Sequence, residues 1–120
     1  MANEISIGAS LSINKNSTPF TARADKTFDQ TGNVTVQLIQ NIGTSAEILA
    51  YGDLSGVPGA ILVKNMDATN YVELSLDSGG TQIFAKLAAG RGMVWIPSVA
   101  AVYAKANTAA CRLLILACEI

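Results

Sequence analysis

Histidine is absent from this 120-residue chain, and charged residues, cysteine and aromatic residues are scarce. Without histidine, the chain can form neither a Ser-His-Asp or Cys-His catalytic arrangement nor a His-ligated metal site. Charged residues make up 14% of the chain, well below the roughly 25% typical of soluble domains. Because its net charge is only −1 and no basic face is available to neutralise phosphates, we expect no nucleic-acid partner.

Long apolar runs are also missing. The longest, Leu113 to Cys118, is far shorter than the roughly 18–20 residues that a helix needs to cross a bilayer. The first residues, Met1 to Ile7, show no basic segment followed by an apolar stretch, so they do not resemble a secretory signal. We therefore expect a protein that does not span a membrane.

Cys111 and Cys118 are the only cysteines, and both fall in one expected strand. In a straight strand rising ~3.3 Å per residue, their Cα atoms would lie roughly 23 Å apart, whereas a disulfide tolerates about 4.4–6.8 Å. Their spacing also differs from the CxxC pattern of zinc and redox sites. We predict two free thiols that pack as small hydrophobic residues, with an inter-subunit disulfide as the alternative.

Alternation of apolar and polar residues is the dominant pattern. Apolar residues occupy every second position from Ile5 to Ile13, which predicts a first strand that ends in the polar turn 14–19. Further strands are expected near 33–40, 47–51, 60–63, 71–76, 81–87, 93–96, 100–106 and 111–119, with a weaker extended segment at 20–27. The alanine-rich stretch 100–110 also allows a short helix. We predict an all-β fold, an antiparallel two-sheet sandwich that is jelly-roll-like, in a single domain over residues 1–120.

Two expected strands are apolar on both faces. Segment 60–63 is continuously apolar, and the last strand carries Leu113 and Ile115 on one face and Leu114 and Leu116 on the other. Because a strand without a polar face is usually covered on both sides, we expect the first to be central and the last to be central or at an interface. Residues 1–18 are a candidate arm that contacts a neighbouring subunit by adding to the edge of its sheet.

Carboxylates are one remaining source of chemistry. Asp67 and Asp77, with Asn65 and Asn70, could hold Ca²⁺, and together with Glu73 the two aspartates could act as paired carboxylates in glycoside cleavage. Aspartates beside Asn, Ser and Gly are, however, typical of turns in which the carboxylate binds its own backbone. We therefore predict no enzymatic activity, no catalytic residue, no cofactor and no metal ligand.

Aromatic residues are the other group of side chains that could form a functional site. Tyr51, Tyr71, Tyr103 and Trp95 would form a sugar-binding platform if they shared one exposed face, and would otherwise serve in a subunit contact or in ordinary packing. The alternation places Tyr71 and Tyr103 opposite the apolar faces of their strands. Our interface candidates, from the expected arm and these aromatics, are Ile5, Ile7, Leu11, Tyr71, Trp95 and Tyr103.

Several segments resemble a recurring pattern in small β-sandwich structural proteins of tailed bacteriophages. The pattern includes Gly59–Leu74, in which a strand leads into Asn65-Met66-Asp67-Ala68-Thr69-Asn70-Tyr71-Val72, and later Leu87–Gly90 and Tyr103–Asn107. Phe28–Gly32 resembles the same group, so the resemblance covers roughly residues 28–119. It implies a non-enzymatic virion protein, foremost a capsid decoration (cement) protein that stabilises the assembled shell.

The same resemblance implies partners and a location. The partners would be other virion proteins, foremost the major capsid protein, and further copies of the chain in a symmetric homo-oligomer such as a trimer. The protein would reside in the virion, which assembles in the host cytoplasm. The alternatives are a tail or head-tail junction component and a carbohydrate-binding or receptor-binding module of a virion.

Overall fold

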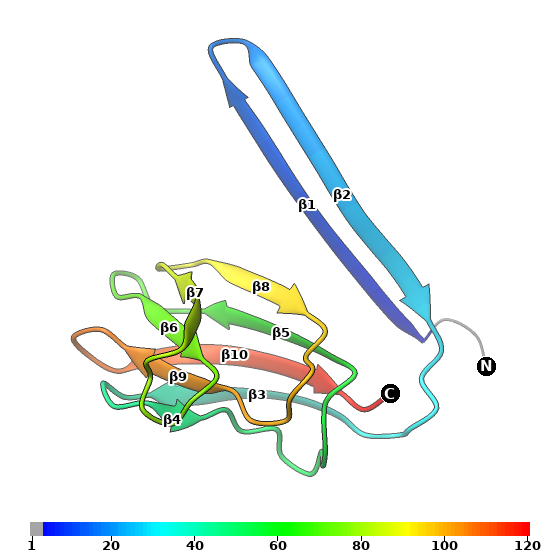
Figure 1. Cartoon of the computed structure of the whole chain (residues 1–120), viewed down its shortest axis with the longest axis vertical. Helices are drawn as coiled ribbons and strands as arrows, with labels where there is room; N and C mark the ends of the chain where they lie inside the picture. Colours follow the sequence, from blue (N-terminus) through cyan, green and yellow to red (C-terminus); the bar gives the residue numbers. More distant parts are fainter. Residues whose placement is uncertain (1–3) are drawn as a thin grey trace.

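The computed structural model describes residues 4–120 and places ten strands in a projecting hairpin and a two-sheet sandwich (Figure 1). The hairpin consists of β1 (Ile5–Lys15) and β2 (Thr18–Phe28). The sandwich strands are β3 (Thr35–Ile42), β4 (Glu47–Ile48), β5 (Ala60–Asn65), β6 (Val72–Ser75), β7 (Ile83–Leu87), β8 (Gly92–Trp95), β9 (Tyr103–Ala106) and β10 (Cys111–Cys118). The expected antiparallel two-sheet sandwich is confirmed.

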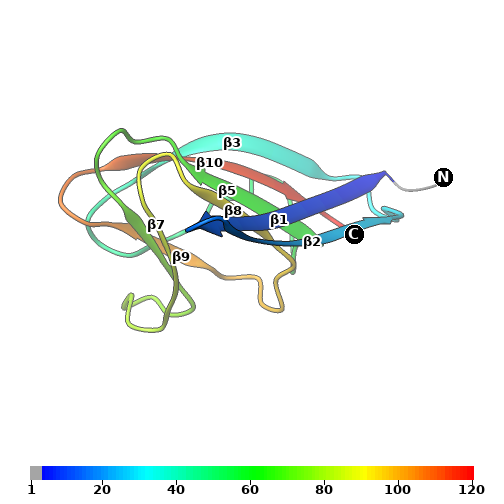
Figure 2. The same ribbon diagram turned by 90° about the horizontal axis from the view of Figure 1, so that it is seen from above.

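The sandwich strands pair in a nested order. One sheet has the order β3-β10-β5-β8 and the other β4-β9-β6-β7 (Figure 2). The first sandwich strand therefore pairs with the last, β4 with β9, β5 with β8, and β6 with β7, all antiparallel. Segments far apart in the sequence meet in this way, so most of the fold depends on long-range pairing.

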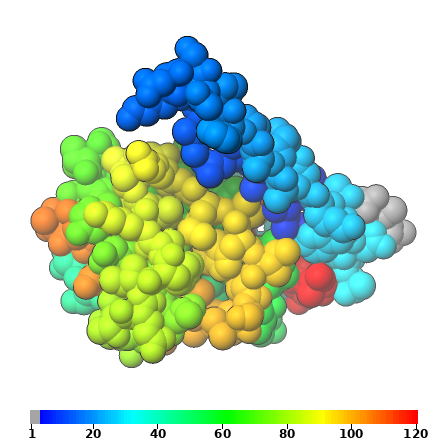
Figure 3. Space-filling view, turned by 45° about the horizontal axis from the view of Figure 1, so that its top comes forward, coloured from blue at the N-terminus to red at the C-terminus, as the bar shows by residue number. Residues whose placement is uncertain are grey.

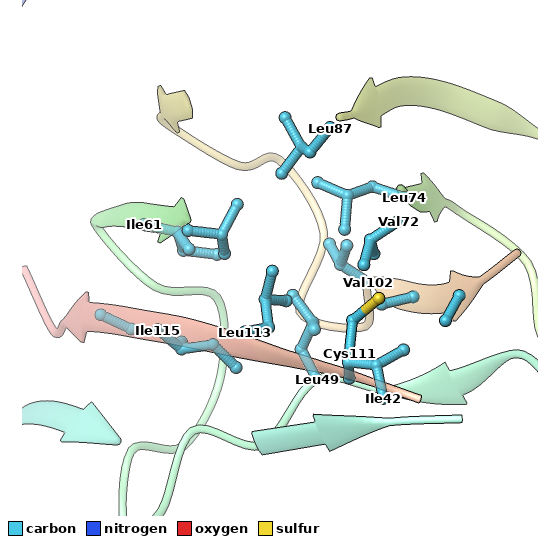
Figure 4. Packing of buried hydrophobic residues seen from close by; sticks show 14 of the residues in the cluster. Ile42, Leu49, Ile61, Val72, Leu74, Leu87, Val102, Cys111, Leu113 and Ile115 are labelled. Carbon is cyan, nitrogen blue, oxygen red and sulfur yellow. The ribbon is translucent and has the colours of Figure 1, made fainter. Parts of the chain in front are cut away.

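The core lies between the two sheets (Figure 4). Ile61, Leu113 and Ile115 point inward from one sheet and are fully buried against Val72 and Leu74 of the other. Each of these strands alternates inward and outward side chains, and the inward set is apolar except for Asn65 at the end of β5. Apolar burial at roughly 25 cal/mol per Å² makes this layer the main stabilising element of the chain.

Three expectations about local structure are wrong. The alanine-rich stretch 100–110 forms strand β9 and a turn, and no helix occurs among residues 4–120. The first turn is only Asn16-Ser17, because β1 continues to Lys15 and Pro19 lies within β2. Pro19 is tolerated because β2 is an edge strand with no further partner in the hairpin sheet.

The third correction concerns the strands that are apolar on both faces. Both β5 and β10 lie inside their sheet, as expected, but only their inner faces are covered by the second sheet. Their outer faces carry Leu62 and Leu116, which remain exposed. The doubly apolar pattern therefore marks a central strand whose outer side is left open by the single chain.

Candidate interaction surface

The arm, defined here as residues 5–28, is a two-stranded ribbon with one apolar and one polar face. Cross-strand partners share a face, and the register pairs Ile5 with Phe28, Leu11 with Ala22 and Ile13 with Phe20. Ala9 and Ala24 complete this apolar face, which only the lysines and Thr18 interrupt. The alternation seen in the sequence therefore separates two chemically distinct faces along the whole ribbon.

The opposite face of the arm is polar except at Gly8 and Pro19. The hydroxyls of Ser12 and Thr21 lie 3.2 Å apart across the strands. Arg23 pairs with Asp25 at 3.1 Å, with both side chains largely in water, so this ion pair adds little stability. This face suits solvent and needs no protein partner.

The apolar face of the arm is exposed beyond its base. Leu11 and Phe20 are both 67% exposed, and Ile13 is 52% exposed. The arm rises away from the sandwich, with its tip as the part farthest from the body (Figures 1 and 3). Because a two-stranded hairpin is marginal in water without a covered apolar face, this arrangement is typical of a segment that docks on another surface.

The base of the arm is fixed to the sandwich. Ile5 is buried. Together with Ile7 of the arm it lines a cavity of about 240 Å³, whose other side includes Leu62, Val94 and Leu116 on the outer face of the β3-β10-β5-β8 sheet. Gln30 Nε2 donates hydrogen bonds to the carbonyl oxygens of Val34 and Glu119, at 3.3 and 2.7 Å. These contacts set the direction in which the arm leaves the body.

The outer face of the β3-β10-β5-β8 sheet carries a second group of apolar side chains, bordered by Gln37, Lys64 and Arg112, and is called here the apolar sheet face. The register puts Leu116 beside Leu62, which is itself beside Val94, and puts Leu114 beside Ile39. Ile39 is 51% exposed, Leu116 38% and Leu62 37%. The base of the arm covers one end of this face, and the remainder is open to water.

The outer face of the β4-β9-β6-β7 sheet is different. Glu73 lies between Lys86 and Lys105 in the register, which alternates charge across three strands. Tyr71 is half-buried beside this row, with the Lys86 ammonium 4.1 Å from its ring centroid in a cation–π contact. This surface, called here the polar sheet face, differs from the other in its row of alternating charge, although Ile48 and Ile83 of the same sheet are also exposed, at 52% and 45%.

The structure separates the interface candidates chosen from the sequence. Ile5, Ile7 and Leu11 share the apolar face of the arm, with Ile5 buried at the base, Ile7 half-buried and Leu11 exposed. Tyr71 and Tyr103 are half-buried on the polar sheet face. Ala2 and Asn3, at the start of the expected arm, lie outside the described residues.

Trp95 lies away from the two candidate tyrosines. It is half-buried, pairs with the inward-facing Ile61, packs against the core and meets Phe84 edge to face at 5.9 Å. Tyr51 also packs against the core, and burial raises the pKa of its hydroxyl to about 12. The aromatic residues therefore do not form one exposed platform.

Sequence reasoning missed Phe20, Ile39, Leu62 and Leu116 as surface candidates, and included Ile13 only as part of the expected arm. Ile13 continues the alternation of Leu11 and could have been chosen with it. Phe20 could have been found only by recognising 20–27 as the partner of the first strand. The other three are identified as exposed only by strand order, which shows that no second layer covers them.

Asp67 and Asp77 occupy turns and bind their own backbone. The amides of Asn70 and Thr69 donate to the Asp67 carboxylate at 2.7 and 3.0 Å, and these bonds hold its pKa below the ordinary value. The Thr81 hydroxyl, followed by the Gln82 amide, does the same for the pKa of Asp77. Within residues 4–120, no cluster of three or more acidic or cysteine side chains has a geometry suited to a metal ion.

Both cysteines are free thiols. Cys111 points into the core, whereas Cys118 is half-buried on the outer side of the same strand. Burial raises the pKa of both thiols, and the Asp67 charge adds to the effect at Cys111. A protonated thiol is a weak nucleophile, so the small hydrophobic role expected from the sequence fits their surroundings.

Comparisons with protein-family models, curated proteins and solved structures find no match to this chain. Among the described residues, no helix has the length and apolar character needed to cross a membrane. The candidate site is therefore defined by the geometry of the chain itself: an apolar arm face and an apolar sheet face, both open to water.

Proposed function

We propose that this chain is a non-enzymatic structural protein of a tailed-bacteriophage particle, and that it acts as a capsid decoration protein. The observation that carries the proposal is the exposed apolar face of the arm. Soluble monomers seldom expose contiguous apolar surface, and where they do it usually marks an interaction site. A protein that binds only the assembled shell stabilises that shell by mass action, without any chemical step.

The strand order also supports a role in a particle. We interpret the four nested pairs of the sandwich as the wrapping of a jelly roll, an architecture used by viral capsid domains as well as by lectins and cupins. Fold alone does not define function. The proposal of a phage virion in particular rests on the segments that resemble small phage structural proteins, at 28–32, 59–74, 87–90 and 103–107.

Binding to assembled shells tests this function. Empty shells assembled from the major capsid protein of the phage that carries this gene would be mixed with the purified chain and sedimented through a sucrose cushion. We expect the wild-type chain to pellet with the shells and Leu11→Asp to remain largely in the supernatant. Ser10→Asp, which adds the same charge on the polar face of the arm, should pellet like wild type.

Other outcomes would overturn the proposal. A wild-type chain that stays in the supernatant at saturating shell concentration is not a decoration protein. A chain that instead sediments with purified tails belongs to the tail or head-tail junction. Imaging of the particle would separate those two positions directly.

A further inference from the structure

We propose that the occupant of the apolar sheet face is the arm of a second copy of this chain. The arm of one copy lies across the outer side of β3, β10, β5 and β8 of its neighbour, apolar face inward, and the contacts close into a symmetric assembly. Such an assembly forms from the purified chain alone. Because it buries the arm faces, the assembly and not the single chain would be the unit that binds the shell, and Leu11→Asp would weaken shell binding by breaking it.

The two surfaces match in chemistry. The arm presents Leu11, Ile13 and Phe20, and the sheet face presents Ile39 and Leu116, with Leu62 beside them in the register. The arm residues and Ile39 are at least half exposed in the single chain, whereas Leu62 and Leu116 are 37% and 38% exposed and border the cavity at the base of the chain's own arm. Docking one apolar face on the other removes both from water together, which is the dominant favourable term in association.

The two surfaces also match in size. The 11-residue strands of the arm make a ribbon roughly 36 Å long and about 10 Å wide, from a rise of ~3.3 Å per residue and a strand spacing of ~4.8 Å. The four-stranded sheet, with strands of up to eight residues, measures about 26 Å by 19 Å on the same values. A two-stranded ribbon can therefore lie across this face as one sheet packs on another, ~10 Å apart.

Area favours a closed assembly over a single open contact. Because the sheet is only about 26 Å long, the footprint of the 10 Å-wide ribbon on it is about 260 Å² on each surface. One junction then buries on the order of 500 Å², well below the ~1,000 Å² expected of a biological interface. In a closed assembly each copy takes part in two junctions, one through its arm and one through its sheet. A reciprocal pair, the smallest closed assembly, therefore buries on the order of 1,000 Å² and reaches the level expected of a biological interface.

Two other coverings fit the contacts less well. The arm would have to pivot as a whole to close on its own sheet, because its register is unbroken from Ile5 to Lys15, and that motion would displace Ile5 from its buried position at the base. Pairing of two arms, face to face, would leave Ile39 and Leu116 in water. Only an arm on a neighbour's sheet covers both surfaces while keeping the base intact.

Sedimentation velocity on the purified chain tests the arrangement, with variants of exposed residues only. Leu11→Asp breaks the arm face, and Ile39→Lys breaks the sheet face at an edge strand. Ser10→Asp is the matched control on the polar arm face. Ile48→Lys is the matched control on the other sheet, where Ile48 has nearly the same exposure as Ile39, 52% against 51%. Circular dichroism and thermal unfolding confirm that each variant keeps the sandwich.

We expect a concentration-dependent oligomer for wild type and both controls. Association should be weakened by roughly tenfold or more in Leu11→Asp and in Ile39→Lys, because each variant removes a central apolar anchor. Mixing these two variants should partly restore association, because the intact arm of one meets the intact sheet of the other. An Ile39→Lys variant that assembles like wild type would show arm-to-arm pairing and overturn the proposal. A wild type that stays monomeric at several hundred micromolar would overturn it as well.

Discussion

The arm and the sandwich are built from the same alternating pattern but differ in what covers their apolar faces. In the sandwich, inward residues such as Leu113 and Ile115 are fully buried between two sheets of one chain. In the arm, Leu11, Ile13 and Phe20 occupy the equivalent alternate positions and are mostly exposed. The same alternating pattern thus produces a buried core where a second sheet covers the apolar face, and an exposed apolar surface where no second sheet does.

Charged residues are also distributed differently over the surfaces of the molecule. The polar outer sheet has a charged row around Glu73, whereas the apolar sheet face and the arm lack such a row. Soluble monomers usually intersperse charge over their surface. The two surfaces that we propose to meet between copies carry only isolated positive charges, Lys15 and Lys26 on the arm face and Lys64 and Arg112 on the sheet face.

The largest expected effect compares one leucine from each region. Leu113→Ala should lower the free energy of unfolding by about 2–5 kcal/mol, because it leaves a cavity in a close-packed core. Leu11→Ala, at a dilution where the chain is monomeric, should change it by less than about 0.5 kcal/mol. Urea unfolding followed by tryptophan fluorescence measures both, and similar losses would mean that the arm is part of the cooperative core.

A second, smaller effect tests a polar contact within the sandwich. Asn65 is buried, donates from Nδ2 to the carbonyl oxygens of Asn70 and Leu87 at 2.8 and 3.0 Å, and accepts from the Asp67 amide at 2.9 Å. Asn65→Ala leaves these groups without partners and should cost about 1–3 kcal/mol in urea unfolding. Asn41→Ala, at an exposed position on β3, is the control and should cost little.

A third effect should be confined to the arm. Asn16 and Ser17 form its two-residue turn with φ of 55° and 62°, and this left-handed region favours glycine at the serine position. Ser17→Gly should stabilise the hairpin by about 0.5–1 kcal/mol, seen as slower amide exchange in 5–28. Unfolding of the sandwich should stay unchanged, and a matching rise there would show that the two regions unfold together.

The smallest effect is confined to alkaline pH. The Tyr51 hydroxyl is buried without a hydrogen-bond partner, and burial raises its pKa from 10 to about 12. Because the folded pKa is the higher one, its contribution to stability is complete below pH 10 and is lost between pH 10 and 12. Tyr51→Phe should therefore unfold less readily than wild type at pH 11 and be at least as stable at pH 8, with Tyr103→Phe as the control in thermal unfolding.

Much of the sandwich could be predicted from the sequence because strands with one covered face alternate with period two. The positions of β3, β5, β6 and β10 follow from that pattern with shifts of a few residues. The helix alternative at 100–110 failed because Tyr103–Ala106 pairs with two neighbouring strands, and tertiary pairing outweighs the helix propensity of alanine. Pro19 was placed in a turn because the sequence does not show that β2 is an edge strand.

The candidate surface could be predicted only in part, for a different physical reason. Alternation identified Ile5, Ile7 and Leu11, but a periodic pattern does not say what covers each face. Leu62 and Leu116 were expected to be buried because their strands are apolar on both sides. Their exposure depends on sheet order, a long-range property, and their final covering depends on a second molecule.

The most direct measurement of the central claim is amide hydrogen exchange of wild type across a range of protein concentrations. If the arm docks on another copy, exchange in residues 5–28 should slow progressively as concentration rises, together with exchange in the outer strands of the apolar sheet face. Exchange in the core strands β6 and β9 should stay constant. Arm exchange that is fast and equal at every concentration would contradict the claim that this apolar face is an interface between copies.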